Sequence, residues 1–261
     1  MSQSDLDGGT VQTQIRDTPQ GPIANLVIDH PRRRNAMGPA VIASLTKAAL
    51  SLGQRGDIRA VTLRGSDGMF SAGANVKIMA GLDGASAHAF ITSLHHAIDA
   101  VRRLPVPVIA VIEGRCYGAA MELAAACDMR IASSDAVMGM PEVRVGIPSV
   151  IEACLLPRLI GWGRTSELLL TGRDMDADEA ARTGFVERTV ASIDVDKAIA
   201  DWLRMILACA PEAVRSQKRI LRSWEPDDRS GIAASIEAFA ASYSTGEPQT
   251  YMARIAGTAK P

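Results

Sequence analysis

The sequence predicts an α/β fold in which a core of strands and helices is followed by a C-terminal helical region. Three observations lead to this prediction. Short apolar runs rich in β-formers alternate with segments of helical periodicity in the first half. Two turns rich in glycine and alanine each follow one of those apolar runs. After Pro148 the pattern becomes mostly helical, which is typical of an α/β core with a helical appendage.

The strands are expected where apolar residues alternate or form short runs bounded by turn residues. Residues 11–16 alternate, and residues 23–29 are rich in β-formers. Gly114 ends the apolar run that begins at Val108. The expected strands are 11–16, 23–29, 60–63, 108–112, 129–132 and 136–139.

The helices are expected where apolar residues recur at every third or fourth position. Pro105 and Pro107 end the second of them, and Pro211 marks a break near the C-terminus. Either Asp176 or Asp178 is expected to cap a helix that contains residues 179–183. The expected helices are 39–52, 85–104, 118–127 and 195–209, with further helical stretches after the break.

Composition restricts the class of protein. A chain of 261 residues with 47% hydrophobic residues can bury a sizeable core in one large domain, with or without a small appendage. The net charge of −1 argues against a nucleic-acid partner. Residues 1–20 are polar and no apolar run is long enough for a membrane span, so we expect no secretory signal, no membrane and a cytoplasmic location. The four cysteines form no CxxC pair, so no metal site is expected.

Two turns are candidates for chemistry. The first is FSAGAN, residues 70–75, and the second is GRCYGAAME, residues 114–122, which opens a helix. Small residues let a backbone approach a ligand closely, and a helix N-terminus offers unpaired N–H groups. Each turn taken singly is also what an ordinary strand-to-helix connection looks like. A phosphate cradle is a further reading, although neither turn has the GxGxxG or Walker spacing.

Two glutamates are candidates for acid–base work. Glu122 lies one helical turn beyond Ala119 in an alanine-rich helix, where loss of solvent would raise its pKa. An exposed helical glutamate is an equal alternative. Glu142 follows Met140-Pro141 among apolar residues, and taken alone it reads as a surface turn.

Taken together, four strings resemble the enoyl-CoA hydratase/isomerase (crotonase) superfamily. They are HPRRRNAM, FSAGANVKIM, GRCYGAAMELAAACDMRIAS and MPEVRVGIP, in that order, and the resemblance runs from about Ile23 to Val190. It implies a crotonase-like spiral of repeated ββα units over residues 1–200. It also implies a C-terminal helical region, residues 201–261, for trimerisation and for covering the CoA. The expected assembly is a homo-oligomer, either a trimer or a dimer of trimers.

The resemblance also implies the chemistry. The amides of Ala74 and Ala119 would form the oxyanion hole for a thioester oxygen, while Glu122 and Glu142 would add water to a 2-enoyl-CoA. Retention of both glutamates favours an enoyl-CoA hydratase. The alternatives are an isomerase, a hydrolase or lyase of the same fold, and a non-catalytic acyl-CoA-binding protein.

CoA would be part of the substrate, so no separate cofactor is expected. The resemblance places a basic loop and the two turns against the CoA, where cations suit its phosphates. A solvated charge run is the alternative reading of the basic loop. The expected CoA-binding residues are Arg32, Arg33, Ser71, Ala72, Asn75, Lys77 and Gly118.

The chain departs from the family pattern in four places. Asn75 stands where the family has aspartate, and Gly118-Ala119-Ala120 replaces a run of glycines. The segment between Glu142 and Pro148 is one residue shorter than in many hydratases. Ser149-Val150-Ile151-Glu152 then replaces a glycine-rich turn that helps to hold the water. Ser149 is a candidate replacement, and Glu152 has no assigned role beyond a charge at a helix N-terminus.

Overall fold

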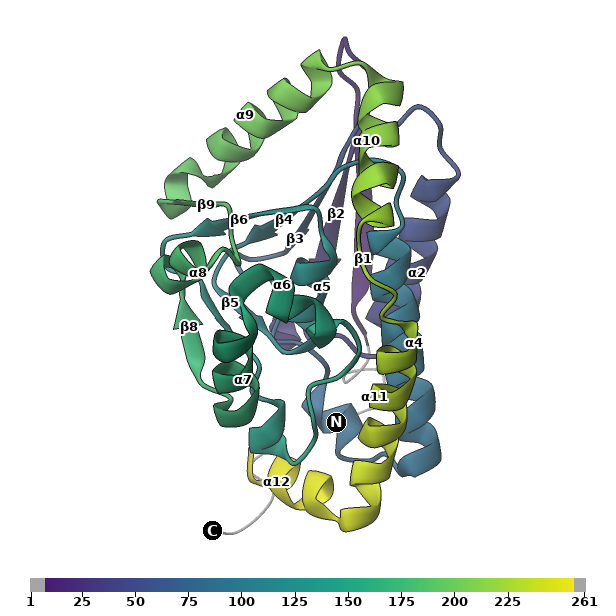
Figure 1. Cartoon of the computed structure of the whole chain (residues 1–261), viewed down its shortest axis with the longest axis vertical. Helices are drawn as coiled ribbons and strands as arrows, with labels where there is room; N and C mark the ends of the chain where they lie inside the picture. The colour runs from purple at the N-terminus through teal and green to yellow at the C-terminus, as the bar shows by residue number, and fades with distance from the viewer. Residues whose placement is uncertain (1–7, 256–261) are drawn as a thin grey trace.

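The computed structural model describes residues 8–255, and it contains two β-sheets wrapped by helices (Figure 1). The larger sheet has the strand order β1-β2-β3-β4-β6-β9, in which only the β1–β2 pair is antiparallel. The smaller sheet has the order β5-β7-β8. The strands are β1 (Thr10–Arg16), β2 (Ile23–Asp29), β3 (Val61–Gly65), β4 (Val108–Ile112), β5 (Arg115–Tyr117), β6 (Met129–Ser133), β7 (Val137–Gly139), β8 (Asp174–Asp176) and β9 (Arg188–Val190).

Helices follow the strands and cover the sheets. The longer ones among the described residues are α2 (Pro39–Gly53), α4 (Gly84–Arg102), α5 (Ala119–Ala126), α7 (Trp162–Thr171), α9 (Val195–Ala208), α10 (Pro211–Ser223), α11 (Arg229–Ser242) and α12 (Glu247–Ile255). Shorter turns of helix connect them, namely η1 (Pro31–Arg33), α3 (Val76–Met79), η2 (Glu142–Val145), η3 (Ile151–Leu155), α6 (Leu156–Ile160), α8 (Ala177–Thr183), η4 (Ser192–Asp194) and η5 (Tyr243–Thr245).

Strand β4 and helix α5 both contribute side chains to one hydrophobic core. Every residue of both elements is buried, as expected for a central parallel strand and for a helix packed on all sides. The sequence of α5, AAMELAAA, contains one charged residue, Glu122, which is therefore carried into the interior. The small alanine side chains let neighbouring elements approach this helix closely.

The structure confirms the predicted α/β class and every predicted strand, with shifts of one or two residues at several ends. It adds three short strands, β5, β8 and β9. Strands of three residues are too short to produce a periodic pattern, and the residues of β5 read as part of a turn. Of the two predicted caps, Asp176 is the one that accepts the Glu179 amide, at 2.7 Å.

The C-terminal helices fold back over the same chain. Helix α11 runs beside α4, and α12 closes the end of the molecule near η2 (Figure 1). The predicted boundary at residue 200 falls inside α9. The outer ends of the two predicted regions, residues 1–7 and 256–261, lie outside the described residues. Within the described part, no helix has both the length and the apolar character needed to cross a membrane.

Candidate active site

A cavity of about 450 Å³ lies beside the N-terminus of α5. Its wall is built by segments that lie far apart in the sequence, among them the loop after β3, the start of α5, the η2–η3 region and parts of α3, α4 and α11. Helices α3, α4 and α11 contribute apolar side chains, and the η2–η3 region contributes both apolar and charged ones. The wall includes Ala72, Ala74, Gly118, Ala119, Glu122, Glu142, Val150 and Phe239.

The first candidate amide, that of Ala74, is left without an acceptor by the way its loop is held. The Met37 amide donates to the Gly73 carbonyl at 2.8 Å, and the Asn75 amide donates to the Met37 carbonyl at 3.0 Å. These two bonds form a parallel bridge around Ala74, so the N–H of Ala74 itself faces away from Met37. In the described part of the chain this amide donates to no protein acceptor.

The second candidate amide, that of Ala119, is the first of helix α5, where no intrahelical acceptor exists. The preceding Gly118 has φ 54° and ψ −122°, and its amide donates to the Gly139 carbonyl at 2.8 Å. A Cβ on Gly118 would lie 2.4 Å from Oε1 of Glu142. Glycine is therefore required here for two reasons: the backbone angle disfavours other residues, and any side chain would collide with the Glu142 carboxylate. Ala74 and Ala119 both line the cavity, and the convergence of their amides on one oxygen, which the family resemblance implies, stays a prediction.

The two predicted glutamates reach the same cavity from different elements. Glu122, on α5, is 3% exposed, and burial, with the nearby charges of Glu142 and Glu152, raises its pKa well above the ordinary value. Burial also raises the pKa of Glu142 to about 7, although the Ser149 hydroxyl, which donates to Glu142 Oε2 at 2.9 Å, favours the charged form. Two carboxyl groups of altered pKa in one cavity are typical of acid–base chemistry.

The predicted CoA-binding residues divide into those that line the cavity and those that do not. Ala72 and Gly118 are on its wall. Ser71 is fully buried, donates to the Asn35 carbonyl at 2.8 Å and accepts from the Gly73 amide at 3.0 Å, so it shapes the loop from behind. Asn75 accepts a hydrogen bond from the amide of Lys77 and so caps α3. Asn75 does not line the cavity, and neither do Arg32, Arg33 and Lys77.

Three arginines that sequence reasoning passed over do line the cavity. They are Arg34, Arg115 and Arg144. Arg34 follows the two predicted arginines in the same basic run, at φ 55°, because the buried side chain of Asn35 anchors the loop to the Ser66 and Met69 carbonyls. The run of three arginines could have indicated a basic wall from the sequence. Which of the three reaches the cavity depends on the turn at Arg34, and that turn is held by contacts with residues far away in the sequence.

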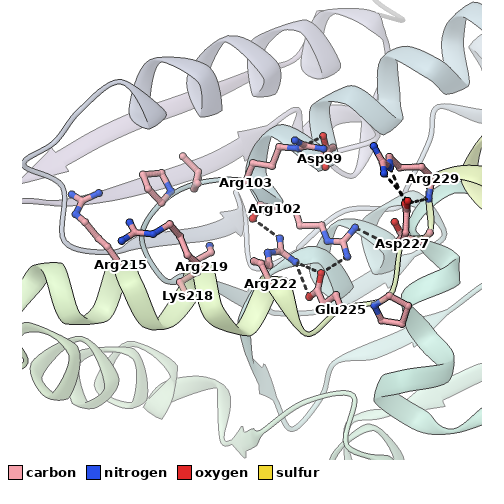
Figure 2. Close-up of a pocket in the computed structure, with 14 residues that line it drawn as sticks. Asp99, Arg102, Arg103, Arg215, Lys218, Arg219, Arg222, Glu225, Asp227 and Arg229 are labelled. Atoms are coloured by element: carbon pink, nitrogen blue, oxygen red, sulfur yellow. Dashed lines mark hydrogen bonds and ion pairs between the residues drawn. The ribbon is translucent and has the colours of Figure 1, made fainter.

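A second cavity, of about 490 Å³, lies between the end of α4, helix α10 and the segment that leads into α11. It is lined by many cations, yet most of them are matched by carboxylates. Figure 2 shows Arg102 and Arg222 both reaching Glu225, and Arg229 paired with Asp227. We interpret this cavity as an ion-pair network that ties the C-terminal helices to α4. Among the described residues, no group of three or more His, Cys, Asp or Glu side chains is placed to hold a metal.

The fold and this site define an enzyme of the crotonase class. The enoyl-CoA hydratase/isomerase family model matches residues 18–255. A crystal structure of an enoyl-CoA hydratase/isomerase from Xanthobacter autotrophicus Py2 superimposes with a TM-score of 0.85 at 27% identity, covering 95% of this chain and 94% of that one. The chain belongs to the enoyl-CoA hydratase/isomerase family, whose members act on acyl-CoA substrates.

Two further relatives carry names of different activities. The mouse enoyl-CoA hydratase domain-containing protein 2, mitochondrial, is 32% identical over 243 residues, which are 90% of this chain and 82% of that protein. A monofunctional enoyl-CoA isomerase from M. smegmatis is also 32% identical, with a TM-score of 0.69, covering 82% of this chain and 92% of that one. Family membership is therefore established, while the relatives divide between hydratase and isomerase.

The expected cytoplasmic location is wrong as a deduction from the sequence. The mouse, human, bovine and Arabidopsis relatives are all named as mitochondrial proteins, while bacterial proteins match as well. The polar character of residues 1–20, on which the expectation rested, does not distinguish between these compartments.

Proposed function

We propose that this protein is an enoyl-CoA hydratase, which adds water across the 2,3 double bond of a 2-enoyl-CoA thioester. One observation carries the proposal: the buried carboxyl group of Glu122 and the half-buried Glu142 share a cavity with the unpaired amides of Ala74 and Ala119. An isomerase needs to move one proton and can use one carboxylate. Hydration needs both an acid and a base on one water, and two carboxyl groups at one cavity suit that need.

The amides supply electrostatic stabilisation. In the proposed mode of binding, the thioester oxygen accepts hydrogen bonds from Ala74 and Ala119, so that the negative charge of the enolate develops beside two donors. Each donor of this kind contributes about 3–4 kcal/mol to the transition state. The partial positive charge at the start of a helix adds to the effect at Ala119.

The glutamates supply the proton transfers. A water held between Glu122 and Glu142 loses a proton to one carboxylate as its oxygen bonds to C3, and the other carboxyl group gives a proton to C2. The net result is addition of one water, with both groups restored after a proton returns between them. Ser149 supports this arrangement, because its hydroxyl holds Glu142 at 2.9 Å.

In the proposed mode of binding, the basic residues contact the CoA end of the substrate and the apolar residues contact its acyl end. Arg34, Arg115 and Arg144 on the cavity wall offer positive charge for the CoA phosphates. The predicted Arg32, Arg33 and Lys77, outside the wall, would add to this charge. Met79, Leu94 and Phe239 give the cavity an apolar lining, which suits an acyl chain.

The test is turnover of a panel of 2-enoyl-CoA thioesters, followed by loss of the conjugated-enoyl absorbance and by a mass gain of one water. Replacement of Glu142 by Gln is expected to lower kcat by at least about a hundredfold. Absence of turnover with every 2-enoyl thioester, for a protein that still binds CoA esters in calorimetry, would contradict the proposal and favour a non-catalytic role.

The second candidate is an enoyl-CoA isomerase, which the likeness to the M. smegmatis enzyme supports. Incubation with a 3-enoyl-CoA distinguishes the two, because an isomerase yields the 2-enoyl thioester without any gain of mass. An isomerase whose single base lies elsewhere is expected to tolerate Glu142→Ala, whereas the proposed hydratase is not.

A further inference from the structure

One face of helix α10 carries a row of cations along the second cavity. Arg215, Lys218, Arg219 and Arg222 recur at helical spacing, so they lie on the same face of the helix, and all four line the cavity. Like charges at this spacing repel one another. Arg215 and Lys218 are nevertheless buried, at 8% and 6% exposed. Such a row needs negative charge close by.

The carboxylates on the cavity wall do not supply that charge to the whole row. Seven arginine and lysine side chains line the cavity, against four carboxylates. The ion pairs of the four are Glu225 with Arg102 and Arg222, Asp228 with Arg102, Asp99 with Arg103, and Asp227 with Arg229. In the described part of the chain, Arg215, Lys218 and Arg219 therefore have no ion-pair partner on the wall.

Lys218 and Arg219 keep donors that no described residue accepts. Lys218 Nζ donates to the Val106 carbonyl at 2.8 Å and to Asp128 Oδ2 at 2.6 Å, which uses two of its three N–H bonds. Burial lowers the pKa of Lys218, although Asp128 opposes that change, so its charged form has room for further stabilisation. Arg219 is exposed and donates to the Ser216 hydroxyl at 2.8 Å.

Arg215 is occupied on one side only. Its Nη2 donates to the carbonyls of Gly56 and Ile58, at 2.8 Å each. Its Nε lies 3.6 Å from a carboxylate oxygen of Glu212, a side chain that is 82% exposed. Within residues 8–255, its Nη1 has no acceptor. A buried guanidinium with unused donors on a cavity wall is suited to bind an anion.

The unmatched cations gather at one end of the cavity. Figure 2 shows Arg215, Lys218 and Arg219 together at that end, while Glu225 and Asp227 lie toward the other. The cavity, of about 490 Å³, has room for a group much larger than one water. The ion-pair network between α4 and the C-terminal helices is therefore balanced at one end and positive at the other.

We propose that Arg215, Lys218 and Arg219 form a binding site for a phosphate group, carried either by free phosphate or by a nucleotide. The paired N–H groups of a guanidinium match two phosphate oxygens, and a lysine adds a point charge. A dianion also reduces the repulsion along α10 more than a single carboxylate would. The site lies outside the cavity proposed for catalysis, so it goes beyond the hydratase function and does not depend on it.

The test is isothermal titration calorimetry of the full chain with inorganic phosphate, diphosphate and adenosine diphosphate, at an ionic strength held constant with chloride. Arg219→Glu places a negative charge at the site and is expected to weaken binding by at least about tenfold. Arg164→Glu is the matched control, since Arg164 is an exposed arginine of α7 that lines neither cavity. It is expected to keep the wild-type affinity.

A further variant separates this site from the catalytic cavity, whose arginines also attract phosphate. Arg115→Glu changes that cavity alone and is expected to leave the Arg219-dependent binding unchanged. The three probes distinguish the sources of the phosphate group. Binding of inorganic phosphate or diphosphate shows that a free anion is sufficient, whereas binding of adenosine diphosphate alone shows that the nucleotide is required.

Unfolding provides a second readout. A probe that binds only the folded state raises Tm by about 3 °C at ten times its dissociation constant. This rise is expected in the wild type and in Arg164→Glu, and it is expected to be lost in Arg219→Glu.

Two results overturn the inference: no binding of any probe at millimolar concentration, or equal affinities in Arg219→Glu and Arg164→Glu. If no probe binds and Arg219→Glu lowers the sedimenting mass, an acidic side chain of a second copy is the occupant instead. A wild type that turns over no enoyl-CoA contradicts the proposed function and leaves this site unaffected.

Discussion

At the scale of single residues, the site depends on two glycines, each of which precedes one of the candidate amides. Gly73 and Gly118 both have positive φ, and each lies against another part of the site: a Cβ on Gly73 would be 2.3 Å from the Tyr117 carbonyl oxygen. These close approaches bring the Ala74 and Ala119 amides to the same cavity. A methyl group at Gly73 would have to move backbone, and one at Gly118 would have to move the Glu142 carboxylate.

Gly118→Ala is therefore expected to damage catalysis more than folding. The added Cβ would displace Glu142 and strain the backbone, which predicts a loss in kcat of roughly a hundredfold and a loss of about 1–3 kcal/mol in stability. Steady-state kinetics and urea unfolding measure the two effects. The control is Gly163→Ala in α7, where no atom lies within 4 Å, and which is expected to gain up to about 1 kcal/mol. Unchanged kcat in Gly118→Ala would contradict this account of the turn.

At the scale of elements, the placement of Glu122 depends on how α5 is held at both ends. Its first amide faces the cavity, and its last carbonyls need donors. Arg130 of β6, only 3% exposed, supplies them by donating to the carbonyls of Ala124 and Cys127, and it also pairs with Glu187. The cation at the C-terminus of α5 also complements the helix dipole.

Arg130→Met is expected to destabilise the protein by about 2–4 kcal/mol, because it takes the side-chain donor away from the Cys127 and Phe185 carbonyls and removes the partner of Glu187. Thermal and urea unfolding measure this loss. Arg173→Met is a matched control, since Arg173 pairs with Glu167 and Glu179 at the surface, where ion pairs contribute about 1 kcal/mol or less. Equal losses in the two variants would show that Arg130 does not have the structural role assigned to it.

At the scale of the whole molecule, the fold leaves apolar side chains exposed on the C-terminal helices. On α9, Met205 is 55% exposed; on α10, Ile220 is 44% and Leu221 49% exposed; and Trp224, at the end of α10, is 70% exposed. Exposed apolar side chains of this size are candidates for an interaction surface. The expectation that the C-terminal region mediates a homo-oligomer predicts that they lie in a subunit interface.

Sedimentation analysis is expected to find three or six chains per particle. The double variant Ile220→Asp/Leu221→Asp places charges on this surface and is expected to shift the protein toward smaller species, by at least about tenfold in dissociation constant. Leu50→Asp on α2, where Leu50 is 58% exposed, is the control and is expected to keep the wild-type mass. A wild type that sediments as a monomer at micromolar concentration would refute the oligomer prediction.

The glutamates of the cavity also make the stability of the whole protein depend on pH. The pKa of Glu142 rises from 4.5 to about 7 on folding, so the folded state holds this proton more tightly. The resulting stabilisation is complete below about pH 4.5 and is lost as the pH rises through about 7.

Glu142→Gln is therefore expected to be more stable than the wild type at pH 8, by about 2 kcal/mol, with a gap that closes toward pH 4.5. Urea unfolding at several pH values and fixed protein concentration measures it. The surface variant Glu237→Gln is expected to follow the wild-type curve. A gap that widens on acidification would reverse the sign of the argument.

Much of the fold could be predicted from the sequence because it is encoded locally. The apolar runs of β2 and β4 and the periodic faces of α2 and α4 depend on neighbouring residues alone, and those elements lie where the patterns placed them. The short strand β5 escaped prediction because its pairing with β7 is the interaction that forms it. The expectation that Glu122 and Glu142 act together came from the family resemblance, because the local sequence around either residue does not indicate the other.

The sequence by itself determined the α/β class and the family. It also pointed to residues of the two turns and to Glu142, which line the cavity. Only the tertiary structure decided that Arg34, rather than Arg32 or Arg33, reaches the cavity wall, and that Glu152 meets His95 across 57 positions of chain. The physical reason is that periodicity and turn chemistry act between near neighbours. The surroundings of a buried charge are set instead by elements far apart in sequence that packing brings together.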